Sequence, residues 1–176
     1  MEPVFEQMRN ISAAASTQLE LQRAMAAYAL RSDMSFAPEV AEQRRAMVAG
    51  RLPGPDWPER PMLIVAVNAE TGELAKFDRQ SGVALVDAAT AAISLPGAGP
   101  THSINGTRYI SGGVRSVDNA DLATGFGTVI VLSPFSGRTG PLPPGQFEGL
   151  RRPPGADLAS EVEALRRAGS HVEVIT

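Results

Sequence analysis

The sequence contains no cysteine and two histidines, His102 and His171. Without cysteine the chain can form no disulfide and offers no thiolate ligand to a metal. Two histidines argue against a histidine-built zinc site. Gly97-Ala-Gly99 does not open a helix after a strand, and Gly137-Arg-Thr-Gly140 lacks the P-loop lysine, so neither indicates a nucleotide site. We therefore expect no metal and no cofactor.

Long apolar runs and an excess of basic residues are missing too. The longest stretch without a charged residue, 88–107, contains Pro96, Pro100 and several glycines, so we expect no transmembrane segment. The net charge of −3 argues against nucleic-acid binding, which needs a basic face. The chain starts Met-Glu-Pro, without a basic region followed by an apolar one, so no targeting segment is expected and the predicted location is the cytoplasm.

What is present is the composition of a soluble globular protein. The chain has 176 residues, of which 43% are hydrophobic and 20% charged, enough to bury a core and too apolar for a disordered segment. Residues 3–31 predict one helix, because Val4, Met8, Ile11, Ala15 and Leu19 repeat at spacings of three and four. A second helix is predicted over 39–48, before a proline-rich connector at 51–58. We therefore predict an N-terminal helical segment, 1–58, and a second part, 59–176.

The second part alternates short apolar runs with helical patterns. We predict strands at 62–67, 74–77, 108–110, 129–132 and 172–175, helices at 83–93 and 157–168, a turn at 69–72 and a loop at 133–154, with Gly169 after the last helix. Strands that alternate with helices indicate an α/β fold with a largely parallel sheet.

Four segments of this part form an ordered set of motifs. They are Ser94-Leu-Pro-Gly-Ala-Gly-Pro100, Ile104-Asn-Gly-Thr-Arg-Tyr-Ile-Ser-Gly-Gly-Val-Arg-Ser116, Asn119-Ala-Asp-Leu-Ala-Thr-Gly125 and Thr128-Val-Ile-Val-Leu-Ser-Pro134. The set resembles the C-terminal half of the patatin-like phospholipase domain, and the resemblance begins near Met62. It implies part of a three-layer α/β/α domain, preceded here by the N-terminal helices.

The resemblance also implies a chemistry, because members of that family hydrolyse lipid acyl esters with a serine and an aspartate. The serine lies in a Gly-x-Ser-x-Gly elbow, which this sequence does not contain. The aspartate begins an Asp-Gly-Gly motif, and here that position is Ser111, followed by Gly112 and Gly113. A serine hydroxyl is a poor base near neutral pH. We therefore expect a catalytically incomplete C-terminal portion of such a domain, inactive on its own.

Two other functions stay open at this point. One is a non-enzymatic binding or regulatory module that kept the scaffold, and the other is an active hydrolase in which Ser111 has become the nucleophile. Gly112 and Gly113 are interpreted as residues that permit positive φ after a strand, and Asn119-Ala-Asp121 as a capping turn. The partners implied are a lipid or acyl-ester ligand, encountered in the cytoplasm or at a membrane surface, and an N-terminal partner chain or a second copy of this chain.

Overall fold

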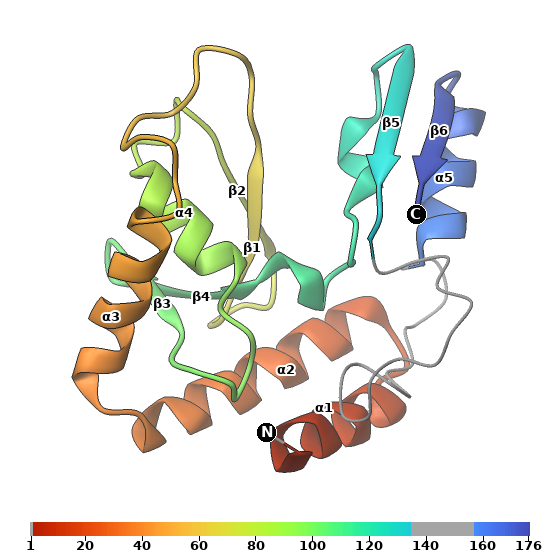
Figure 1. The fold of residues 1–176 in the computed structure, drawn as a ribbon. Helices are drawn as coiled ribbons and strands as arrows, with labels where there is room; N and C mark the ends of the chain where they lie inside the picture. Colours follow the sequence, from red (N-terminus) through yellow and green to blue (C-terminus); the bar gives the residue numbers. More distant parts are fainter. Residues whose placement is uncertain (1, 135–156) are drawn as a thin grey trace. The chain divides into compact units, whose positions relative to one another are not determined.

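The computed structural model of this chain describes residues 2–134 and 157–176 (Figure 1). These residues form a mixed α/β structure with five α-helices and two sheets. The chain divides into two compact units. The terminal unit comprises Met1–Gln18 and Arg115–Thr176, and the central unit comprises Leu19–Val114. The boundary predicted after residue 58 falls inside the central unit.

The N-terminal stretch forms two helices where the sequence pattern predicts one. Helix α1 spans Glu2–Ala14 and α2 spans Gln18–Ser32, so the prediction of an unbroken helix over 3–31 is wrong. Ser16 and Thr17 lie at the break. Their hydroxyls compete for backbone hydrogen bonds and favour the start of a helix over its interior. The apolar spacing continues across this break and conceals it.

The central unit contains one antiparallel sheet. Its strands are β1 (Ile64–Asn68), β2 (Leu74–Phe77), β3 (His102–Ile104) and β4 (Thr107–Ser111), in the order β2-β1-β4-β3. All three neighbouring pairs are antiparallel, so the predicted largely parallel sheet is wrong for this unit. Asn105 and Gly106 have φ values of 51° and 83° and join β3 to β4 by a two-residue turn. Such a turn forces the two strands it joins to run antiparallel.

Two further helices belong to the central unit, and both were predicted to within two residues. They are α3 (Pro38–Ala49) and α4 (Leu85–Ala92). Helix α4 packs on the sheet, and this interface forms a buried cluster of Ala66, Phe77, Ala88, Ala91 and Ile104. Trp57, in the connector, donates its indole N–H to the carbonyl of Val83 at 2.8 Å and packs against the same cluster. A short 3₁₀ turn, η1 (Asp33–Ser35), precedes α3.

Among the described residues, the parallel strand pair lies in the terminal unit. Strand β5 (Thr128–Leu132) pairs with β6 (His171–Ile175), and α5 (Leu158–Arg167) packs beside them (Figure 1). Asp157 caps α5 by accepting the Ser160 N–H at 2.9 Å, and Gly169 follows the helix as predicted. The core of this unit consists of Ala120, Val129, Val131, Val162, Leu165 and Val172.

Two expectations concern the rest of the chain. Most of the loop predicted over 133–154 lies outside the described residues. Among the helices that the structure describes, none is long and apolar enough to span a membrane.

Candidate functional site

Ser111, the residue at the family's aspartate position, ends strand β4. It lies opposite Ala66 of β1, and its N–H donates to the carbonyl of Ser94 at 2.8 Å. The fold therefore brings together the start of the first motif quoted above and the end of β4 in the second. The chain then turns into a 3₁₀ helix, η2 (Gly112–Val114), and the Gly113 N–H donates to the Ser111 hydroxyl at 3.2 Å.

The two glycines after Ser111 have different physical roles, and neither is the one expected. Both lack a positive φ, so the interpretation that they permit a left-handed backbone is wrong. A Cβ on Gly112 would lie 2.6 Å from the Val65 carbonyl oxygen, which is inside van der Waals contact. At Gly113 a Cβ would meet the Ser111 hydroxyl at 3.3 Å. Gly112 is thus required by the close approach of β1, whereas Gly113 has more room.

His102 of the central unit is hydrogen-bonded to Asp87. It lies on β3, and its Nε2 is 3.0 Å from Oδ1 of Asp87 on α4. Its side chain is only 9% exposed, so the imidazole is largely removed from solvent. The reason is the β3–β4 hairpin, which carries residue 102 into a strand packed against α4.

Asp87 is shared between His102 and an arginine. Arg45 of α3 binds both carboxylate oxygens, with distances of 2.6 Å from Nε to Oδ1 and 3.0 Å from Nη2 to Oδ2. Hydrogen bonding from Arg45 lowers the pKa of Asp87. Burial lowers the pKa of His102, although the hydrogen bond to Asp87 opposes this. We call Arg45, Asp87 and His102 the histidine cluster.

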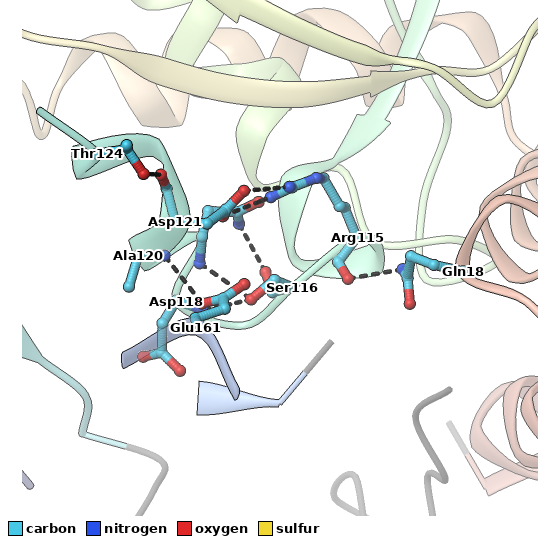
Figure 2. A network of polar contacts seen from close by, with 9 residues as sticks. Gln18, Arg115, Ser116, Asp118, Ala120, Asp121, Thr124 and Glu161 are labelled. Carbon is cyan, nitrogen blue, oxygen red and sulfur yellow. Dashed lines mark hydrogen bonds and ion pairs between the residues drawn. The ribbon is translucent and has the colours of Figure 1, made fainter. Parts of the chain in front are cut away.

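The terminal unit holds a second polar network, built on the segment after the motif (Figure 2). The Arg115 guanidinium binds both carboxylate oxygens of Asp121, and its Nη1 also donates to Oδ1 of Asn119 at 2.8 Å. This bidentate geometry raises the pKa of Arg115. Gln18 donates its Nε2 to the Arg115 carbonyl at 2.6 Å.

Ser116 and Glu161 complete this network and are drawn below Arg115 in Figure 2. The Ser116 oxygen accepts the N–H groups of Asp118 and Asn119 at 3.3 and 3.0 Å, and its hydroxyl donates to the Glu161 carboxylate. Glu161 also accepts the Ala120 N–H at 2.9 Å. The Glu161 residue is 5% exposed, and burial raises its pKa. We call Arg115, Ser116, Asp121 and Glu161 the glutamate network.

The sequence reasoning placed part of this network and missed the rest. Asn119 does precede a short helix, η3 (Ala120–Ala123), but its side chain does not cap that helix, because its Oδ1 accepts from Arg115 and its Nδ2 donates to the Ser116 carbonyl. The importance of Glu161 was missed. A signal existed, since Glu161 lies three residues after Leu158 and four before Leu165, on the apolar face of α5.

The glutamate network does pair a serine hydroxyl with a carboxylate, but Ser116 is only 2% exposed and so is closed to a substrate, and the histidine cluster contains no hydroxyl or other nucleophile. The Ser116 oxygen also accepts two backbone N–H groups, and the Nε2 of His102 is hydrogen-bonded to Asp87. Over residues 2–134 and 157–176 no group of three histidine, aspartate or glutamate side chains could hold a metal ion. No family model, curated protein or solved structure matches this chain.

Proposed function

We propose that this chain is a patatin-like protein of the lipid acyl-hydrolase type, corresponding to the C-terminal part of that domain and inactive on esters by itself. The observation that supports this is the end of β4. The strand runs directly into Ser111, Gly112 and Gly113, and Gly112 packs against the backbone of Val65. A tight glycine turn after a strand that presents a side chain at the sheet end is the arrangement implied by the resemblance.

The chemistry of the residue at this turn supports inactivity. An acyl-ester hydrolase needs an activated nucleophile and a base that takes its proton. The Ser111 hydroxyl accepts a hydrogen bond from Gly113, and it carries no charge with which to act as that base. The sequence contains no Gly-x-Ser-x-Gly elbow. Both members of the family's serine and aspartate pair are therefore missing from this chain.

Treatment of the purified chain with a fluorophosphonate probe and with p-nitrophenyl butyrate tests the proposal. We expect no labelling and no turnover above that of the Ser111→Ala variant, with an active serine esterase as the positive control. Ser111→Asp alone should also be inactive, because a base without a nucleophile has nothing to deprotonate. Labelling of Ser111 together with turnover would instead establish an active hydrolase with a rearranged site.

A binding module without chemistry is a second candidate function, favoured by one observation. The face of the β5–β6 pair that points away from α5 carries exposed apolar side chains: Ile130 is 63%, Leu132 70% and Ile175 58% exposed. We call these three residues the outer face. Exposed apolar patches of this kind mark binding surfaces. Sedimentation of the chain with and without phosphatidylcholine vesicles separates lipid binding, which pellets the chain with the vesicles, from self-association.

A further inference from the structure

Helix α3 is attached to the central unit mainly by polar contacts. Val48 is its one buried residue, and most of its other side chains are exposed. By contrast, α4 buries Leu85, Ala88, Thr90 and Ala91. Burial of apolar side chains is what normally holds a helix in place. The position of α3 therefore depends mainly on the polar contacts of its arginines, whereas the position of α4 depends mainly on apolar burial.

Two consecutive arginines make these contacts. Arg44 donates to the carbonyls of Pro100 and Ala98 at 3.1 and 3.4 Å. It lies so close to the turn at Gly99 that a Cβ there would be 1.5 Å from its Nη2. Arg45 forms its bidentate pair with Asp87. The histidine cluster is thus the polar anchor of α3 on α4 and β3.

Protonation of His102 would change the charge balance of this anchor. Near neutral pH, the Asp87 carboxylate binds the guanidinium of Arg45 and the uncharged imidazole of His102, and the guanidinium of Arg44 also acts electrostatically on that imidazole. A proton on His102 adds a third cation beside a single carboxylate, in a partly buried place. The other groups nearby do not balance it: Tyr109 is the cross-strand neighbour of His102, and the carboxylate of Asp33 is held by Thr101 and Arg108.

We propose that the histidine cluster is an acid-sensitive latch that holds α3 on the central unit at neutral pH and releases it on acidification. In the released state Arg44 and Arg45 leave, and His102 and Asp87 become hydrated. Hydration relieves the burial that lowers the pKa of His102, so release takes up a proton. The pKa of Asp87 also returns upward on release, so both groups favour release in acid. This latch is independent of any ester chemistry.

Hydrogen exchange of the full chain measures the latch directly. With labelling times corrected for the pH dependence of chemical exchange, the opening constant of the 38–49 amides should rise as pH falls from 7.5 to 5.5. Uptake of one proton limits this rise to about tenfold per pH unit. The amides of β1 and β4 should keep their protection. Equal α3 protection at all pH values, or a parallel loss in β1 and β4, would overturn the proposal.

The chain offers a matched control because it has two histidines. His102→Asn removes the imidazole and cannot titrate, so its α3 opening should not depend on pH over this range. His171→Asn, at an exposed position on β6, should behave as the wild type. Pronounced pH dependence in His102→Asn would contradict the latch.

If His102→Asn does not fold, the His171→Asn variant still decides the question. Its single imidazole can be titrated by NMR in the folded chain. We expect a midpoint below the ordinary range of histidine, and a midpoint at or above that range would exclude a latch driven by His102.

Discussion

The sheet of the central unit and the β5–β6 pair of the terminal unit bury their strands differently. Strand β1 has a neighbour on each side, and its adjacent residues Ala66 and Val67, which point to opposite faces, are both fully buried. Strand β5 alternates, with Val129 and Val131 buried and the residues between them exposed. Both sequences are apolar runs. An apolar run indicates that a strand is at least partly buried. Whether one face or both faces are buried depends on the elements that pack against the strand.

The largest effect we predict lies in the central sheet. Gly112→Ala would place a Cβ 2.6 Å from the Val65 carbonyl oxygen, in backbone that cannot rotate away. Overpacking of this kind destabilises by about 3 kcal/mol. Urea unfolding followed by circular dichroism measures the change.

The neighbouring glycine is the control for this variant. At Gly113 the nearest atom to a new Cβ is the Ser111 hydroxyl, which is the end of a short side chain. Gly113→Ala should change the free energy of unfolding by less than about 1 kcal/mol, since alanine also restricts the unfolded chain. Equal effects of the two variants would show that close packing at 112 does not restrict the turn.

The second prediction compares the two faces of β5. Val131 lies in the core of the terminal unit, so Val131→Ala should destabilise that unit by about 2 kcal/mol through lost apolar burial. Leu132 is adjacent and points to the outer face, so Leu132→Ala should change stability by less than about 0.5 kcal/mol. Thermal unfolding of both variants tests the pair. A larger loss at Leu132 would mean that its face is covered in solution.

Much of the secondary structure was predictable because the signals are local. The helix over 83–93 and the strand over 129–132 agree with α4 and β5 to within two residues. The parallel-sheet prediction failed because the turn at Asn105-Gly106, a strong hairpin signal, was not used to place a strand before it. The helix break at residues 15–17 was concealed by continuous apolar spacing.

The polar clusters were less predictable for a different physical reason. Asp87 and His102 are fifteen residues apart, and Ala120 and Glu161 are forty-one apart, so each contact depends on tertiary packing. No local sequence pattern predicts a contact between residues so far apart in the sequence. What the sequence does show is a charged residue on an apolar helical face, as at Glu161, and that feature indicates a buried partner without identifying it.

The third prediction concerns the sign of the pH dependence in the terminal unit. Burial raises the pKa of Glu161, so its contribution to stability is full below the unfolded pKa and is lost as pH rises through the folded one. Glu161→Gln keeps an acceptor for the Ala120 N–H and should stay within about 1 kcal/mol of wild type.

Urea unfolding between pH 4 and pH 8 tests this sign. The stability of Glu161→Gln relative to wild type should increase with pH, because the variant has no carboxylate to ionise in the buried site. His102 gives the opposite trend, since its lowered pKa makes stability fall as pH falls. A relative stability of Glu161→Gln that decreases with rising pH would contradict the assignment of Glu161 as a carboxyl group destabilised by ionisation.

The last prediction has the smallest effect on the stability of the folded chain and concerns the outer face. The outer face exposes three apolar side chains beside His171 and Glu173, and among the described residues no third strand pairs with β5 or β6. Exposed apolar side chains and unpaired strand edges favour association. We expect light scattering to show a mass that increases with concentration. Ile130→Lys should reduce that increase while changing the free energy of unfolding by less than about 0.5 kcal/mol. Met34→Lys is the control, because Met34 is 92% exposed and lies on η1. If Met34→Lys reduces association equally, general surface charge is responsible, and a wild-type monomer at every concentration would exclude self-association through the outer face.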